Sequence, residues 1–538
     1  MKGADLLIEC LKKQGVKVIF GMPGSLAREI DAAIYANKDD IKYIMVRHEG
    51  GAAYMADAYS RVTGEIGICI TVPGPGAGNA FSGMLEAYTA NSAVLLITAQ
   101  NQSCYKNRDQ SKMGHGLDQL TAFKPVTKYM KRVELVDDIP DAVYEVFGSL
   151  RLGRPKPALL EITRDALGAM SNTAICKRNN GIKVKPKEEQ IKLVIKELQK
   201  AKKPCIIAGR GVSHCSSSME VLELSKNICA PIITTKMGKG VVPESERMSL
   251  GDSDTKGAQK AIAESDLILA IGVRFTQIDT KNWTLKLPET IIRIDADPSE
   301  INSEYKAVIG IAADIKLTII MILDRLKTGV DSCKKKDRIE VYRNMTLKER
   351  VPRYIKLLNQ VLPSDAIVSL DVHMAGYSAV KYLKVEKAEN FLHSPISMAM
   401  GYALPSAIGA KIAHPVRPVI AFCGDGGFLL SSSEIATIMK YNLDIVIIVI
   451  NDKLFNTMRS VQLEHSGYGL DFSLYNPDLI KFAESYGMES FKVTRNRKFA
   501  STVKKAIDLK KPVLIEVIPE KTIRGMIFYG LRRFINKL

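Results

Sequence analysis

The sequence predicts an α/β protein of three doubly wound domains, each built on a parallel sheet. Short apolar runs rich in β-branched residues alternate with helical patterns along the whole chain, and most of these runs end at Gly, Asp or Asn. Runs that are apolar on both faces are typical of parallel strands covered by helices on both sides. The length of 538 residues is also sufficient for about three domains of roughly 150 residues each.

Two polar stretches with little strand pattern, 172–190 and 328–350, divide these runs into three groups. We therefore expect an N-terminal domain at 1–170, a central domain at 190–327 and a C-terminal domain at 350–520. Examples of the expected strands are the runs at 16–20, 66–72, 93–99, 205–209, 267–273, 290–296, 366–371, 419–425, 445–452 and 512–518. Ligands of such sheets bind beyond the carboxyl ends of the strands, so the residues after each run are the candidates for function.

The last segment, 521–538, has the pattern of a basic amphipathic helix. Apolar residues from Ile523 to Leu538 share one helical face, and arginines such as Arg532 fall elsewhere. Docking on the protein itself, as a lid, is the first interpretation, and contact with an acidic membrane surface is the less favoured one. No apolar run is long enough to span a bilayer, and the N-terminus lacks the apolar core of a signal peptide. We expect a cytoplasmic protein.

The net charge of +18 does not by itself indicate a nucleic-acid partner. Lysine and arginine are spread along the chain, and no zinc-finger spacing or RNA-binding aromatic motif accompanies them. A lysine-rich solvated surface explains the charge, so no nucleic acid is expected to bind. The nine cysteines include no CxxC pair, which argues against a disulfide framework.

Two acidic residues follow neighbouring expected strands near the C-terminus. Asp425 lies in the run Gly424-Asp425-Gly426-Gly427, and Asp452 follows the next strand, with one helix between them. Carboxylates facing a space that admits phosphate suit Mg²⁺, and glycines let backbone N–H groups approach the phosphate closely. Turns before helices often have similar sequences, so this motif alone does not identify a site.

This arrangement resembles the cofactor motif of thiamine-diphosphate enzymes. The resemblance implies that Mg²⁺ is held by Asp425, Asp452 and the backbone carbonyl of Leu454, with the diphosphate against residues 424–427. Asp452 stands where the family usually has asparagine. It can still ligate, and Lys453 would partly offset the additional negative charge.

The first domain carries a second motif, in which Arg47-His48-Glu49-Gly50-Gly51 begins a helix after an expected strand. The resemblance implies that Glu49 forms a hydrogen bond to N1′ of the aminopyrimidine. This bond stabilises the 4′-imino tautomer, which removes the proton from the thiazolium C2. In isolation, a surface glutamate at a helix start would be the simpler interpretation.

Further matches imply the remaining cofactor contacts. Pro23 and Gly24 follow the first strand, Asn79 closes a loop at 71–79 that resembles the family's TSGPG…N loop, and Met400 begins an MGxxLP-like segment. The resemblance implies that Met400 wedges between the two rings of the cofactor and enforces its bent conformation. Without the resemblance, Met400 would be interpreted as an ordinary core methionine.

The branch of the family that the chain resembles most is that of the acetolactate synthase large subunits. Supporting segments lie at 125–128, 153–157 and 238–244. The resemblance implies decarboxylation of a 2-oxo acid such as pyruvate, followed by ligation to a second oxo acid. It also implies a homodimer or homotetramer, with each cofactor between the first domain of one subunit and the third domain of another. A regulatory subunit is a possible further partner.

Several departures from that branch keep alternatives open. His115 replaces an active-site glutamine and can act as a general acid, which would favour simple decarboxylation; a structural histidine is the alternative. The segment after Asp452 lacks the tryptophan that synthases use to favour a second oxo acid. Residues 250–257 replace a flavin-binding segment, so FAD stays open, with Arg274 as its expected contact. A non-ligating decarboxylase, a pyruvate oxidase-like enzyme and a catalytically degenerate paralogue are the other interpretations.

Overall fold

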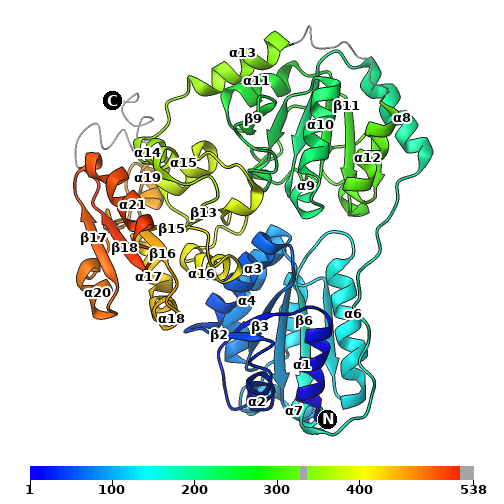
Figure 1. The fold of residues 1–538 in the computed structure, drawn as a ribbon, viewed down its shortest axis with the longest axis vertical. Coiled ribbons are helices and arrows are strands. Elements are labelled where there is room, and N and C mark those ends of the chain that lie inside the picture. Colours follow the sequence, from blue (N-terminus) through cyan, green and yellow to red (C-terminus); the bar gives the residue numbers. More distant parts are fainter. Residues whose placement is uncertain (327–335, 521–538) are drawn as a thin grey trace.

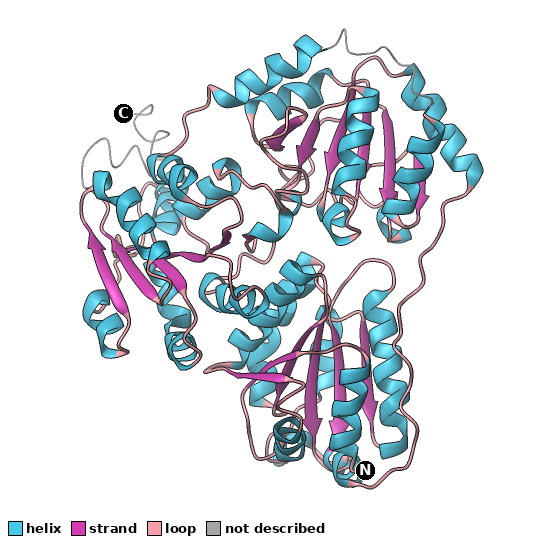
Figure 2. Cartoon of the chain, viewed as in Figure 1, coloured by secondary structure: helices cyan, strands magenta, loops and turns pink. Residues whose placement is uncertain are grey.

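Three parallel sheets with interleaved helices make up the protein, as the sequence predicts (Figures 1 and 2). The structure is a computed structural model and describes residues 1–326 and 336–520. Each sheet lies within one of the three predicted domain ranges, whose limits stay a prediction. The expected amphipathic helix at 521–538 lies outside the described residues. None of the helices in 1–326 and 336–520 has the length and apolar character of a membrane span.

The first sheet has the strand order β2-β1-β3-β4-β6-β5. The chain passes from β1 to β2 on one side and then crosses back to β3, so the topological switch point lies between β1 and β3. Ligands of doubly wound sheets bind at such a point. The strands are Val18–Gly21, Lys42–Met45, Gly67–Thr71, Val94–Gln100, Tyr129–Val133 and Ala158–Thr163 (β1 to β6), and the helices are Gly3–Lys13, Arg28–Ala36, Glu49–Thr63, Pro75–Ala90, Gln119–Phe123, Ile139–Arg151 and Arg164–Gly168 (α1 to α7).

The central sheet has the order β12-β11-β10-β7-β8-β9, with its switch point between β7 and β10. Its strands are Pro204–Ala208, Ile232–Thr234, Ser249–Asp252, Leu267–Ile271, Thr290–Asp295 and Ile309–Ala312 (β7 to β12), and its helices are Glu188–Lys200, Arg210–His214, Ser218–Ile228, Lys256–Glu264 and Ile315–Arg325 (α8 to α12). The polar stretch at 328–350 is more than a linker. It contains the helix α13, Lys336–Leu347, whose Tyr342 is buried and donates a hydrogen bond of 2.7 Å to Glu264 on α11.

The third sheet has the order β14-β13-β15-β16-β18-β17, with its switch point between β13 and β15. Its strands are Ile367–Leu370, Phe391–Leu392, Val419–Gly424, Ile445–Ile450, Glu489–Val493 and Val513–Val517 (β13 to β18). Its helices are Arg353–Val361, Met374–Tyr382, Ala403–Ala413, Asp425–Ser431, Ile435–Lys440, Asn456–Ser466, Leu479–Ser485 and Phe499–Asp508 (α14 to α21). The strands β15 and β16 pair in parallel, with Gly424 opposite Ile450, so their carboxyl ends meet at one edge of the sheet.

The first and third domains share one hydrophobic core. The helix α3 packs on α16, and buried side chains of both sheets belong to a single cluster that includes Ala53, Met55, Ala407 and Ile408 (Figure 1). The packing is close because Gly409 presents no Cβ: a side-chain carbon there would lie 2.3 Å from the carbonyl oxygen of Met55. The two domains therefore pack closely against each other at this junction.

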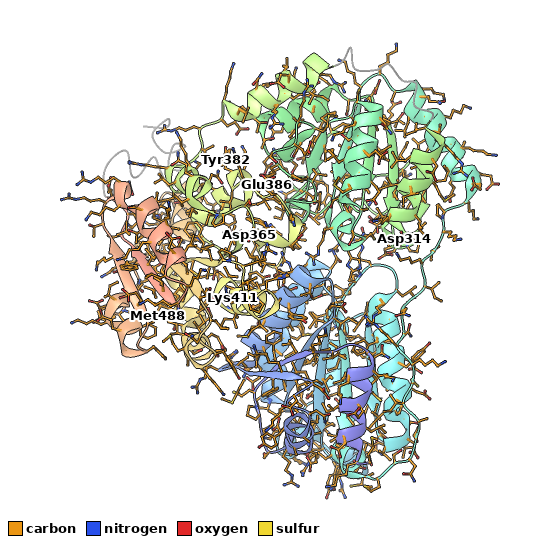
Figure 3. The ribbon with its side chains drawn as sticks, viewed as in Figure 1. Asp314, Asp365, Tyr382, Glu386, Lys411 and Met488 are labelled. Atoms are coloured by element: carbon orange, nitrogen blue, oxygen red, sulfur yellow. The ribbon has the colours of Figure 1, made fainter. Side chains whose placement is uncertain are left out.

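Polar contacts join the domains around this core. Met45 N in the first domain donates a hydrogen bond of 2.8 Å to Tyr441 Oη in the third domain. The central domain meets the third domain where Ser245 donates a hydrogen bond to Glu386 (Figure 3). The three domains thus contact one another through specific side chains, and the switch points of the central and third sheets face different cavities.

Candidate cofactor site

A cavity in the third domain opens at the carboxyl ends of β13, β15 and β16. It has an empty volume of about 630 Å³ and is lined by residues that include Asp425, Asp452, Leu454 and Met400, together with the glycines at 424, 426 and 427. The residues predicted from the C-terminal motif therefore surround one space. They meet there because parallel strands deliver the residues that follow them to the same sheet edge.

Asp425 is the more firmly held of the two carboxylates. It begins α17 and is 3% exposed. Its Oδ1 accepts a hydrogen bond from Gly426 N at 2.9 Å, and its Oδ2 accepts bonds from Lys453 N at 2.8 Å and Asn476 Nδ2 at 2.7 Å. Burial nonetheless raises the pKa of Asp425.

The pKa of Asp452 is raised by burial and, in addition, by a neighbouring charge. Its carboxylate accepts hydrogen bonds of 3.2 Å from Leu454 N and from Asn456 Nδ2. Burial, and then the nearby negative charge of Asp425, raises the pKa of Asp452 to about 6. Two carboxylates that repel each other at the edge of a cavity form a ready receptor for a cation.

These donors fit a magnesium ion that is bound together with a diphosphate. Mg²⁺ prefers hard oxygen ligands and usually keeps water and phosphate oxygens among its six ligands. Within the described parts of the chain, no group of three or more His, Cys, Asp or Glu side chains is placed to hold a metal ion. Asp425, Asp452 and the Leu454 carbonyl would therefore supply only part of the octahedron, which leaves positions for phosphate oxygens.

The glycines of this motif are needed because of close packing. A Cβ on Gly427 would lie 2.6 Å from the carboxylate carbon of Asp371, and one on Gly426 would lie 2.5 Å from the ring of Phe455. A bulkier residue at either position would displace these neighbours or fill the space above the turn. The absence of side chains here is what leaves the backbone open to a phosphate group.

The first domain gathers a second group of predicted residues at its own switch point. Glu49 is the first residue of α3 and is 3% exposed. Its Oε2 accepts a hydrogen bond of 3.0 Å from Asn79 Nδ2, so the two residues that the motifs imply are in contact. A Cβ on Gly76 would lie 3.1 Å from Glu49 Oε1. The loop at 71–79 therefore packs directly against the glutamate.

The same loop brings the other first-domain candidates close to Glu49. His115 is exposed, has a positive φ of 57°, and its Nδ1 lies 3.1 Å from Pro73 O. Gly24, which with Pro23 follows β1, packs on Val72: a Cβ on Gly24 would lie 2.4 Å from a methyl group of that side chain. The segments that carry Gly24, Glu49, Asn79 and His115 thus meet at one edge of the first sheet.

The two groups of residues do not meet within one chain. Among the residues that the structure describes, those that line the third-domain cavity lie between Val372 and Met458, and neither Glu49 nor Asn79 is among them. The two groups of predicted residues therefore face different spaces within the chain.

Two carboxylates outside the predicted motifs support these two groups of residues. Glu434, from the third domain, is buried and its Oε1 accepts hydrogen bonds of 3.1 Å from both Arg47 N and His48 N, directly before Glu49. Asp371 accepts two bonds from Gly401 N, next to Met400, and burial raises its pKa to about 6. Asp371 directly follows β13, so the rule of examining the residue after each strand would have found it.

A further cavity lies at the switch point of the central sheet, between the central and first domains. Its empty volume is about 580 Å³, and Arg154, Arg210, Arg274 and Asp295 are among its lining residues. Arg274 donates hydrogen bonds of 3.2 Å to Glu300 and to the carbonyl oxygen of Thr89 in the first domain. This cavity is therefore the candidate site for a flavin, and Arg274 lies in its wall.

The segment at 250–257 is charged in this chain. Lys236 Nζ lies 2.5 Å from Asp252, which is completely buried, and 2.6 Å from Asp254. The backbone N–H of Lys236 also donates to Asp279, a residue of the cavity wall. This ion-paired cluster adjoins the wall of the cavity and contacts it through Asp279.

Comparison with known proteins identifies the family to which the chain belongs. Three family models match successive parts of the chain: the N-terminal TPP binding domain of thiamine pyrophosphate enzymes over residues 1–122, their central domain over 191–322, and their C-terminal TPP binding domain over 373–517. The chain belongs to the thiamine pyrophosphate enzymes. Thiamine pyrophosphate is the same compound as thiamine diphosphate, so the predicted family is confirmed.

Relatives within the thiamine pyrophosphate enzymes cover nearly the whole chain. The "Probable acetolactate synthase large subunit" of Methanocaldococcus jannaschii is 31% identical over 96% of this chain and 92% of its own length. The "Acetolactate synthase large subunit" of Lactococcus lactis is 29% identical over 97% and 93%. The "Putative thiamine pyrophosphate-containing protein YdaP" of Bacillus subtilis is 28% identical over 99% and 94%. The chain is thus an acetolactate synthase-like thiamine pyrophosphate enzyme.

Proposed function

We propose that this enzyme binds thiamine diphosphate with Mg²⁺, decarboxylates a 2-oxo acid of the pyruvate class, and joins the remaining carbon unit to a second 2-oxo acid. The observation that carries the proposal is the pair Asp425 and Asp452 beside an open glycine turn in one cavity. Two of the relatives are acetolactate synthase large subunits by name, which supports the same ligation.

The residues of the chain have separate tasks in this proposal. Asp425, Asp452 and the Leu454 carbonyl hold Mg²⁺ and through it the diphosphate, while Met400 supports the rings. Bound thiamine diphosphate supplies the carbon nucleophile and accepts the electron pair that CO₂ leaves behind. Glu49 holds a proton at N1′ of the aminopyrimidine. Its burial beside Asn79 keeps that carboxyl group away from water.

We further propose that the working enzyme is at least a homodimer, with a homotetramer as a larger form of the same arrangement. The third-domain cavity has no wall from the first domain of its own chain. The first domain of a second subunit would supply Glu49, Asn79 and His115 opposite Asp425. The name "large subunit" of the relatives supports an additional, regulatory subunit as partner.

A second candidate function is decarboxylation without ligation, and His115 favours it. Its imidazole is exposed at the first-domain edge, and its Nδ1 faces the carbonyl oxygen of Pro73. That contact occupies Nδ1 and leaves Nε2 of the ring available for contact with a substrate. A general acid at this point would deliver a proton where the synthase reaction needs a second oxo acid.

Product analysis separates the candidates. The purified protein is incubated with pyruvate, Mg²⁺ and thiamine diphosphate, and the products are identified by mass spectrometry. Acetolactate is expected; acetaldehyde would favour the decarboxylase, and acetate would favour an oxidase. Absence of any product across a panel of 2-oxo acids, together with absence of cofactor binding, would contradict the proposal.

The variant Glu49→Gln tests the role of the glutamate directly. It is expected to bind thiamine diphosphate with affinity similar to that of the wild type, because the metal site is untouched. Exchange of the cofactor's C2 proton with deuterated water, followed by NMR, is expected to slow by about 10²-fold or more. Normal exchange in this variant would remove Glu49 from the mechanism.

A further inference from the structure

The segment that carries Met400 into the third-domain cavity is held by side chains of the first domain. This segment, residues 393–402, connects β14 to α16 and has no regular secondary structure. We call it the strap. Met400 belongs to the strap, lines the third-domain cavity and is 36% exposed. A flexible connection would leave Met400 mobile, so the contacts of the strap decide where its side chain lies.

One carboxylate holds the middle of the strap. Glu86, on α4 of the first domain, is completely buried. Its Oε2 accepts a hydrogen bond of 2.6 Å from Ser394 Oγ and another from Ser397 Oγ. Ser394 Oγ also accepts a bond of 2.8 Å from Ala399 N. Glu86 thereby fixes, through two hydroxyl groups, the turn that immediately precedes Met400.

The ends of the strap are held by α3. Arg61 Nη1 donates to His393 O at 2.9 Å and lies 2.8 Å from Tyr402 Oη, so it reaches both ends. Tyr402 in turn donates to Asp57 Oδ2 at 2.9 Å. Arg61 is also 3.6 Å from Glu86, which makes Asp57, Arg61 and Glu86 one buried cluster.

The backbone of the strap requires such support. Met398 has a φ of 50°, which side-chain-bearing residues seldom adopt. Gly401 is held on the other side of Met400, where its N–H contacts both carboxylate oxygens of Asp371. A strained conformation persists only where surrounding contacts over-determine it. Glu86 and Asp371, from two different domains, supply those contacts.

We propose that Glu86 is a positioning residue, which holds Met400 through Ser394 and Ser397 at the place in the third-domain cavity that the cofactor needs. This inference rests on the proposed function, since Met400 affects turnover only if a cofactor lies against it. Displacement of a supporting group by about 1 Å can slow a reaction by about 10²-fold. The effect of Glu86 should therefore appear in kcat and cofactor affinity, and should depend on the Met400 side chain.

A double-mutant cycle tests this dependence. The change Ser394→Ala with Ser397→Ala is made in the wild type and in Met400→Ala. The dissociation constant of thiamine diphosphate is measured by calorimetry with Mg²⁺, and kcat and KM are measured with pyruvate. In the wild type, kcat is expected to fall about tenfold or more and cofactor binding to weaken, with little change in the KM for pyruvate. In Met400→Ala, the same change is expected to alter either quantity by less than about twofold.

Equal losses in both backgrounds would overturn the inference, because serines that act only on the structure give additive effects. His414→Phe is the matched control: it removes the contact of His414 Nε2 with Val62 O, which joins α3 to the end of α16 that is distant from the strap. It is expected to leave kcat unchanged, and a loss equal to that of the serine variant would also overturn the inference. Thermal denaturation confirms that each variant is folded.

The cofactor titration separates this inference from the proposed function. Wild-type protein that does not bind thiamine diphosphate would overturn both. Wild-type protein that binds it, with a serine variant that matches the wild type in affinity and in kcat, would overturn only the positioning role of Glu86.

Discussion

The departure of Asp452 from the family's usual asparagine has a physical cost that the structure makes visible. Asp425 and Asp452 line one cavity, and burial together with the charge of Asp425 raises the pKa of Asp452 to about 6. A carboxyl group whose pKa is higher in the folded protein than in the unfolded chain contributes its full stabilisation at pH values below its pKa in the unfolded chain. That stability is lost as the pH rises through about 6. In the metal-free protein, ionisation of Asp452 should therefore lower the free energy of unfolding at neutral pH.

The variant Asp452→Asn removes this penalty. Without Mg²⁺ and cofactor, its melting temperature at pH 7.5 is expected to exceed that of the wild type by about 2–4 °C. At pH 4 the two proteins should melt at nearly the same temperature, because Asp452 is then protonated. Thermal denaturation followed by circular dichroism at both values checks this. A difference that is independent of pH would contradict the titration of Asp452 as its cause.

Magnesium and cofactor are expected to reverse the order of the melting temperatures of the wild type and Asp452→Asn. Saturating Mg²⁺ and thiamine diphosphate should stabilise the wild type more than the variant at pH 7.5, because the cation interacts with two carboxylates in one protein and with one in the other. Below pH about 6 this advantage should shrink, since protons compete with the metal for Asp452. The same thermal measurements, repeated with ligands, test both statements.

At the scale of elements, the segment from β9 to α11 distinguishes the central domain of this chain. Lys236 neutralises Asp252, which has no exposure to water, and Asp254. Removal of one partner from a buried pair leaves an uncompensated charge, which typically costs about 3–5 kcal/mol. Lys236→Met is therefore expected to lower the free energy of unfolding by about that amount. Denaturant titration measures it, and the exposed pair of Lys260 and Glu264, disrupted by Lys260→Met, is the control with little expected effect.

The same segment predicts how the enzyme treats flavin. Since a charged cluster stands where the resemblance places the flavin segment, the purified protein is expected to be colourless, and its activity is expected not to respond to added FAD. The visible absorption spectrum and an assay with and without FAD check this. A yellow protein that loses activity when its flavin is removed would show that the cavity beside Arg274 accommodates the cofactor despite the cluster.

At the scale of the whole molecule, the two separate groups of site residues predict complementation between subunits. Glu49→Gln and Asp425→Ala should each be nearly inactive as homodimers. In a mixed dimer, one site carries both changes and the other carries neither. Unfolding and refolding the two variants together should restore about a quarter of wild-type activity, because about half of the dimers are mixed and each has one intact site. No recovery, with mixed dimers shown by native mass spectrometry, would place each cofactor within a single chain.

Much of the architecture was predictable because its signals are local. Runs such as 445–452 are apolar on both faces, so they indicate a buried parallel strand without knowledge of their neighbours. The motif at 424–427 can likewise be placed from the local sequence alone, since it follows a strand and α17 begins at Asp425. The edge strand β17, with the mixed sequence Glu489–Val493, has no such pattern, and only pairing with β18 makes it a strand.

What the sequence did not reveal are contacts between residues far apart along the chain. Glu86 lies 308 positions from Ser394, and Glu434 lies 386 from His48. Nothing near Glu86 in the sequence distinguishes it from a helical surface glutamate. Such pairs become visible only after α3, α4 and α16 have packed, because the fold then removes water from around them.

The shared core of the first and third domains has a consequence for how the chain comes apart. One cluster contains buried side chains of both domains, in addition to a separate cluster in each, whereas the two clusters of the central domain are not shared in this way. Residues that pack together melt together, so units of cooperativity need not follow the order of the chain. The first and third domains, although the central domain separates them in sequence, should unfold as a single calorimetric unit. During synthesis on the ribosome, the first domain would then wait for the last third of the chain before its core is complete.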